Sequence, residues 1–415
     1  MCIMLRGILA FRAPDMQTLP ELHRDLPEQE YANRALLTRQ ELEREDLDAL
    51  ILSHEPNIRW LVGYHIMVTQ RIKWMIAAVI FCRDADQGSV LMCATDATGS
   101  QMACVDATRY WDDSSQPPFT SYADPIKVLT DEIRRRGLKD KRIGMELGAG
   151  MRVDLPLKEA DGLRDALPEA EIVDFAPSLW RLRSVKSEPE IERLREAARI
   201  TMEGYRTAFP LMAEGMTEKQ LASIIYAKWF ELGADHIALL SIISSPPGNR
   251  YAHVGPSECP IPRGEIVNID GGCVFKGYCA DIYRLACVGP PPDDQRRLVD
   301  CIIEAKREMI AQIRPGAPCG HVYEAGERVM RSAGYGHLIP DITWGHSVGL
   351  DVHELPTITK GSEELIKKNM VFCVEPWTLD YSDWSQLRNF EDMIRVTADG
   401  TELLSPGLDD LYVCP

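Results

Sequence analysis

Two neighbouring stretches decide the fold of the second half of this chain: IVNIDGG at residues 266–272 and CADIYRL at residues 279–285. Each is an apolar strand pattern that contains an aspartate. If they form a hairpin that turns at residues 274–277, Asp270 and Asp281 lie directly opposite each other, with their Cβ atoms about 5 Å apart. Two facing like charges are unfavourable on a sheet, and a shared proton or a cation would relieve them.

The C-terminal segment repeats this arrangement with glutamates. The apolar strand MVFCVE ends at Glu375, and the strand NFEDMI carries Glu391. A hairpin centred near Asp383 would put the two glutamates opposite each other. His346 lies between the two hairpins in the sequence, and glycines on both sides of it allow close backbone approach.

Each of these residues alone has an ordinary structural explanation. An aspartate at a strand end usually forms a turn, a histidine in a glycine-rich stretch is usually structural, and a glutamate on a strand usually lies at its solvated edge. The conjunction is much harder to obtain by chance. Two facing carboxylate pairs and a histidine are what a dinuclear site for moderately hard cations requires.

Composition indicates a globular protein with two domains. The chain has 415 residues, of which 45% are hydrophobic and 26% charged. Its net charge of −17 argues against nucleic acid or an anionic membrane as a partner. The twelve cysteines show no CxxC pair, so we expect reduced core thiols in a cytoplasmic protein. We expect no signal peptide and no membrane-spanning helix.

The order of elements predicts an irregular arm at residues 1–30, an α/β domain at 31–184 and an α+β domain at 185–415. In the first domain we expect a helix at 31–45 and a turn at 55–57 that follows a buried strand. Strands and helices then alternate up to residue 175. In the second domain, Thr217 and Gln220 form a capping box that begins a helix.

With these motifs in place, the sequence resembles the superfamily of methionine aminopeptidase, prolidase and creatinase, whose catalytic domain has the pita-bread fold. The family pattern D-x-G-x4-G-Y-x2-D-x2-R is matched at residues 270–284, and G-H-x-x-G-x-x-x-H at residues 345–353. Its E-P and E-D pairs are matched at Glu375 and Glu391. The first domain resembles the creatinase-type N-terminal domain, which favours the two-domain prolidase/creatinase branch.

The resemblance implies two divalent metal ions, with manganese expected first and iron, cobalt or zinc as alternatives. A hydroxide that bridges the metals would attack the substrate carbonyl, and Glu375 would accept its proton. His353 and His253 would bind the carbonyl oxygen, and Trp377 and Tyr278 would contact the substrate. The implied metal ligands are Asp270, Asp281, His346, Glu375 and Glu391.

Three positions depart from the family pattern. Trp377 replaces a glycine, Asn389 replaces an arginine and Leu285 replaces a threonine. None of them removes a ligand, but the first two lie beside the site and put a generic peptide substrate in doubt. A tryptophan there would narrow the pocket or offer an aromatic face to a cation.

Three functions therefore stay open. The first is an Xaa-Pro dipeptidase or aminopeptidase that acts on short peptides. The second is a small-molecule enzyme of the same fold, of the creatinase, ectoine hydrolase or dimethylsulfoniopropionate lyase type. The third is a non-catalytic peptide-binding module. The resemblance also predicts a homodimer in which Arg71 of one subunit reaches the partner's active site and grips a substrate carboxylate.

Overall fold

A computed structural model describes residues 25–65, 77–93, 103–110, 125–148, 150–244, 253–383 and 385–415. The chain divides into two compact units, Met1–Leu179 and Trp180–Pro415. The division falls within helix α7 (Ala176–Ser184), close to the predicted boundary after residue 184. Among the described helices, none combines the length and the apolar character needed to cross a bilayer.

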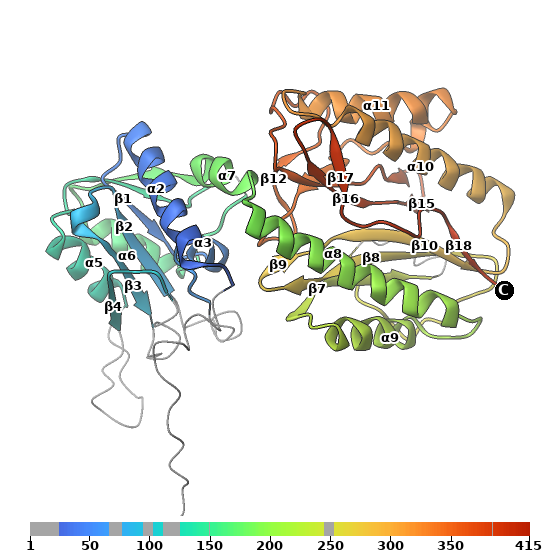
Figure 1. Cartoon of the computed structure of the whole chain (residues 1–415), viewed down its shortest axis with the longest axis horizontal. Coiled ribbons are helices and arrows are strands. Elements are labelled where there is room, and N and C mark those ends of the chain that lie inside the picture. Colours follow the sequence, from blue (N-terminus) through green and yellow to red (C-terminus); the bar gives the residue numbers. More distant parts are fainter. Residues whose placement is uncertain are drawn as a thin grey trace, which may run out of the picture. The chain divides into compact units, whose positions relative to one another are not determined.

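The first unit contains one mixed sheet with the strand order β4-β3-β2-β1-β5-β6 (Figure 1). The central strand β1 pairs antiparallel with β2 and parallel with β5, and it is buried throughout. This mixture of strands and helices confirms the predicted α/β class. The strands are β1 (Ala49–Leu52), β2 (Ala77–Cys82), β3 (Ser89–Cys93), β4 (Ala107–Tyr110), β5 (Arg142–Met145) and β6 (Glu171–Asp174). The helices before α7 are α2 (Glu28–Arg44), α3 (Glu55–Val62), α5 (Pro125–Arg135) and α6 (Leu157–Ala166).

The turn predicted at residues 55–57 is wrong, because helix α3 begins there. Pro56 lies in its first turn, where a missing backbone N–H costs nothing since no helical acceptor precedes it. The Glu146 carboxylate accepts hydrogen bonds from the backbone N–H groups of Ser53 and His54, next to the helix start. The residues that were predicted to form a turn are therefore the N-terminus of a helix. The backbone N–H groups just before this helix donate to Glu146, which is distant in sequence.

The second unit contains two larger sheets and a separate hairpin. One sheet has the order β18-β10-β8-β7, with β9 paired to β8, and the other has the order β12-β11-β13-β16-β17. Strands β14 and β15 form the hairpin. The strands of the first sheet are β7 (His236–Ile243), β8 (Ile266–Phe275), β9 (Tyr278–Cys279), β10 (Ile282–Val288) and β18 (Tyr412–Cys414). The others are β11 (Gly345–Ser347), β12 (Glu354–Thr357), β13 (Val371–Val374), β14 (Thr378–Asp380), β15 (Ser385–Arg388), β16 (Asp392–Val396) and β17 (Thr401–Leu403).

Two pairs of helices flank these sheets (Figure 1). Helix α8 packs on β8 and α9 on β7, while α10 and α11 pack together near β13. The predicted capping box is confirmed, because Thr217 and Gln220 exchange side-chain to backbone hydrogen bonds at the start of α9. The α+β class predicted for this unit is also confirmed. The helices are α8 (Glu188–Ala208), α9 (Glu218–Glu231), α10 (Asp293–Gln312) and α11 (Cys319–Ser332).

The first predicted hairpin exists, but its register differs from the prediction. Asp270 lies opposite Tyr283 rather than Asp281. The turn consists of Lys276 and Gly277, whose φ angles are 47° and 83°, as a two-residue turn with left-handed backbone requires. This turn shifts the pairing by two residues. Because a shift of two keeps side chains on their face, Asp281 becomes the diagonal neighbour of Asp270 on the same side of the sheet.

The second predicted hairpin has the predicted register. Val374 pairs with Asp392 in the sheet, and Thr378 pairs with Arg388 beyond it. Both pairs follow one antiparallel register, and between them this register places Glu375 opposite Glu391. The hairpin prediction is therefore confirmed for the glutamate pair.

Candidate metal centre and adjoining cavity

The five predicted ligands lie in strands of the second unit or directly next to them. Asp270 lies within β8 and Asp281 immediately before β10, so both come from the first sheet. His346 lies on β11, Glu375 follows β13 and Glu391 precedes β16, so these three come from the second sheet. Residues far apart in the sequence therefore meet in the space between the two sheets.

His346 presents one ring nitrogen to the acids. Its Nε2 lies 3.7 Å from Asp281 Oδ2, 3.5 Å from Glu375 Oε1 and 3.8 Å from Glu391 Oε1. Its Nδ1 lies 3.0 Å from the carbonyl oxygen of Ser347, so Nδ1 carries the hydrogen and donates it. The lone pair of Nε2 consequently faces the carboxylates, as metal ligation requires.

The backbone before the histidine is fixed by a glycine. Gly345 has a φ of 152°, and a Cβ atom there would lie 2.4 Å from the carbonyl oxygen of Cys373 on β13. Only glycine lets β11 approach β13 this closely. The close backbone approach predicted for this glycine is therefore the approach of Gly345 to Cys373.

Several buried polar atoms of the cluster have no hydrogen-bond partner among the described residues: Asp281 Oδ1, His346 Nε2 and Glu391 Oε1. One oxygen from each of Asp270, Asp281 and Glu391 lies within 4.8 Å of the others. Donor atoms that share one cation lie roughly 3–4 Å apart, given bonds of about 2.1 Å. Unpartnered buried donors at these separations fit divalent metal ions.

The protonation chemistry of the cluster points the same way. Burial and the neighbouring carboxylates raise the pKa of Asp270 and of Glu391 well above their usual values. Burial and Asp281 raise the pKa of Glu375 to about 8. Burial and the nearby His353 lower the pKa of His346 to about 4, so this ring is neutral and able to ligate. Positive charge from outside the protein would relieve the repulsion among the acids.

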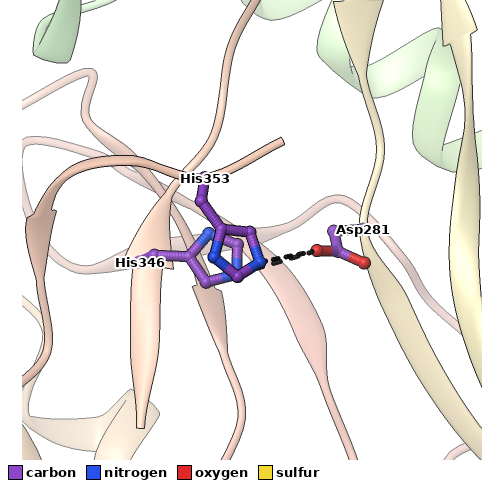
Figure 2. Close-up of side chains that lie close together, drawn as sticks. All are labelled: Asp281, His346 and His353. Carbon is purple, nitrogen blue, oxygen red and sulfur yellow. Dashed lines mark ion pairs between the residues drawn. The ribbon is translucent and has the colours of Figure 1, made fainter. Parts of the chain in front are cut away.

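Two further histidines lie at the rim of the cluster. The His353 Nε2 atom lies 3.6 Å from Asp281 Oδ2, and its ring stacks on His346 with centroids 3.7 Å apart (Figure 2). His253 Nε2 lies 3.9 Å from Asp270 Oδ2. Both side chains are more than half exposed, in contrast to the buried ligands. Their exposure leaves them accessible to a substrate.

Sequence reasoning missed Cys373. Its sulfur, a nitrogen of His346 and an oxygen of Glu391 all lie within 4.8 Å of one another. Burial and the nearby Glu391 raise the pKa of this thiol well above its usual value, so it is protonated. The signal was available, because Cys373 lies two residues before Glu375 and therefore points to the same face of its strand.

A cavity of about 260 Å³ adjoins the cluster. Apart from residues of the cluster and its rim, its lining is apolar or uncharged. Trp377, predicted to contact the substrate, is part of the wall, and its indole N–H donates to the carbonyl oxygen of Thr343. The complete lining is Ser241, Ile243, His253, Asp270, Tyr283, Ile342, Thr343, His353, Glu375, Trp377, Leu387 and Asn389.

Tyr278, which was also predicted to contact the substrate, does not line this cavity. Tyr278 is buried, and its hydroxyl donates to Glu190 of α8, 3.1 Å away. Its side chain therefore joins the strand β9 to a helix instead of lining the cavity. Arg71 falls outside the described residues.

Comparison with known proteins agrees with this arrangement. Residues 192–398 match the metallopeptidase family M24, and residues 34–185 match the creatinase/prolidase N-terminal domain. The uncharacterized peptidase YqhT of Bacillus subtilis is 30% identical over 288 residues, which cover 69% of this chain and 79% of that protein. The Xaa-Pro dipeptidase of Lactobacillus helveticus is 27% identical over 294 residues, or 70% of this chain and 78% of that protein. The fold resembles that of a prolidase from Thermococcus sibiricus, with a TM-score of 0.80, 22% identity, and coverage of 92% of this chain and 99% of the other.

Proposed function

Because the chain belongs to metallopeptidase family M24, we propose that it is a metal-dependent hydrolase of the Xaa-Pro dipeptidase or aminopeptidase type. The observation that supports this most directly is the set of buried, unpartnered donor atoms on Asp281, His346 and Glu391. They lie beside a cavity large enough for part of a short peptide.

The residues that would hold two divalent ions, with manganese the first candidate, are Asp270, Asp281, His346, Glu375 and Glu391. When bound, such ions would supply a hydroxide nucleophile at neutral pH and Lewis-acid activation of a carbonyl. Glu375 borders the cavity and would hold the proton released from the attacking water. His353 and His253, at the rim, would donate hydrogen bonds to the substrate carbonyl oxygen as negative charge develops on it.

A substrate panel with metal tests this proposal. Purified protein is loaded with manganese and incubated with Xaa-Pro dipeptides, Xaa-Pro amides and Xaa-Pro tripeptides, and release of the N-terminal residue is measured. We expect turnover of at least one class, abolished by a chelator and restored by metal. No turnover of any member with metal bound would contradict the proposal.

A second candidate is a hydrolase or lyase that acts on a small non-peptide molecule. The feature that favours it is the wall formed by Trp377, which occupies space in the cavity that a smaller residue would leave open. Such an enzyme would bind metal with the same stoichiometry but leave the whole peptide panel intact. A non-catalytic binding module would bind peptides without turning them over at all.

The resemblance further suggests a homodimer and a cytoplasmic location, and both stay predictions. Light scattering on the purified protein measures the first directly. Arg71 lies outside the described residues, so it supplies no support for the proposed activity.

A further inference from the structure

All residues of the cavity lining that can carry a charge lie on the side of the metal cluster. They are His253, Asp270, His353 and Glu375, all of which belong to the metal cluster or its rim. Among the described lining residues there is no lysine or arginine. On the side of the cavity away from the metals, a substrate carboxylate would therefore meet only apolar or uncharged described residues.

Arg388 is next in sequence to two residues that line the cavity, but its side chain is turned away. Arg388 lies between Leu387 and Asn389, which both line the cavity, and successive side chains of a strand point to opposite faces. The guanidinium of Arg388 is buried and donates to the carbonyl oxygen of Leu387 at 2.6 Å and to Gln295 Oε1 at 3.0 Å. It is held against α10 and provides no charge to the cavity.

Asn389 offers an acceptor there. Its Nδ2 donates to Glu375 Oε2 at 3.0 Å. Once bound metal keeps Glu375 ionised, its carboxylate can only accept, and this fixes the orientation of the amide. Its Oδ1 atom is buried and has no hydrogen-bond partner among the described residues, and the whole residue is only 4% exposed. Burial of a carbonyl oxygen without a donor is unfavourable, so an occupant that brings an N–H group gains a hydrogen bond.

On the basis of the proposed peptidase function, we infer that this cavity selects an uncharged, N–H-donating group and disfavours a free carboxylate. The substrates that fit are peptides that continue beyond the proline, or that end in an amide. An Xaa-Pro dipeptide places only carboxylate oxygens at this position. The same proline with a peptide bond or a primary amide after it supplies the donor that Asn389 lacks. The enzyme would then be an aminopeptidase rather than a dipeptidase.

Two probes of nearly identical shape test this inference: Ala-Pro and Ala-Pro-amide. With the manganese-loaded full-length protein, we expect kcat/KM for the amide to exceed that for the acid by about tenfold or more, since a site built for a hydrogen-bond donor rejects a partner that lacks it. A higher value for the acid would overturn the inference while leaving the peptidase proposal intact. That is also the result expected if Arg71 of a partner subunit supplies the missing cation.

Variants localise the effect. Ile342 lines the cavity and is 49% exposed, so Ile342→Lys brings a cation to it at a tolerant position. We expect the amide-to-acid ratio to fall about fivefold or more through charge attraction, with Ile342→Met as the uncharged control of similar length. Asn389→Leu removes the acceptor at nearly the same side-chain volume and should bring the ratio toward one. The ratio is taken within each variant, so changes in metal content or folding cancel. An unchanged ratio in both Ile342→Lys and Asn389→Leu would contradict the inference.

If neither probe is hydrolysed, the peptidase proposal fails and binding decides the inference separately. The shift in melting temperature of the manganese-loaded protein is then measured with each probe. Greater stabilisation by Ala-Pro-amide supports the inference, and equal or greater stabilisation by Ala-Pro overturns it.

Discussion

Glu354 and Glu391 are both buried acids of the second unit, but their charges are balanced in different ways. Glu354, next to His353 in the sequence, is 3% exposed, and Glu391 of the metal cluster is 1% exposed. Glu354 Oε2 lies 3.0 Å from Lys186 Nζ, and Oε1 accepts from Arg183. Burial opposes its ionisation, but the two cations outweigh burial and lower the pKa of Glu354 to about 2.

The metal cluster has no such internal cation among the described residues. An oxygen of Glu391 is without a partner, and burial and neighbouring acids raise its pKa instead of lowering it. Equal burial thus has opposite electrostatic consequences. A buried acid that forms ion pairs within the chain contributes to the fold, whereas a buried acid without such a partner is a candidate for binding a cation.

Removal of one acid from the unpaired cluster should have the largest effect. Asp281→Asn takes away a carboxylate that lies near His346, His353 and Asp270. We expect loss of at least one metal ion by elemental analysis, and a fall in kcat/KM of roughly a thousandfold or more. The metal-free variant should melt at a higher temperature than the metal-free wild type, because one repelling charge is gone. A lower melting temperature would show that the cluster is balanced in some other way.

Loss of the rim histidine should separate catalysis from metal binding. His353→Ala leaves the five predicted ligands in place, so metal content should be retained. We expect kcat to fall about a hundredfold, since a hydrogen-bond donor to the developing oxyanion is worth roughly that much. The measurement is steady-state kinetics on protein with verified metal content. An unaltered kcat would show that His353 has no catalytic role.

The paired cluster should respond in stability instead of activity. Glu354→Gln leaves Arg183 and Lys186 buried without their counter-charge, and we expect a loss of about 3–5 kcal/mol in the free energy of unfolding. Urea denaturation measures this loss. Glu188→Gln is the matched control, because Glu188 is largely exposed in its ion pair with Arg395 and should cost less than about 1 kcal/mol. Similar losses in the two variants would remove the distinction between the clusters.

The stability of the metal-free protein should also depend on pH, because the pKa of Glu375 is raised in the folded chain. Glu375 has a pKa of about 8 in the folded chain against 4.5 as the ordinary value, so its stabilising effect is present below pH 4.5 and is lost as the pH rises toward 8. With a chelator present, we expect the free energy of unfolding to decrease between pH 5 and pH 8 by an amount on the order of 3 kcal/mol. Glu375→Gln should flatten this slope, and added manganese should oppose it. A metal-free wild type whose stability rises over this interval would contradict the assignment.

Much of the site could be predicted from local patterns. Apolar strands that end in acids identified Asp270, Asp281, Glu375 and Glu391 as candidates, and antiparallel pairing about Asp383 put the glutamates opposite each other. The register of the aspartate hairpin was predicted incorrectly, because residue types alone did not locate its two-residue turn. The error was harmless to the site, since a shift of two residues preserves the face.

The candidate ligands and the strands that carry them follow from local sequence, because side-chain alternation and hairpin geometry act between residues close in the chain. The contacts between elements distant in sequence follow only from the folded structure. It turned the Tyr278 hydroxyl toward Glu190 of α8 and placed the guanidinium of Arg388 against Gln295 of α10. These outcomes depend on packing between segments distant in sequence, and no local pattern encodes which of two faces a neighbouring sheet will cover.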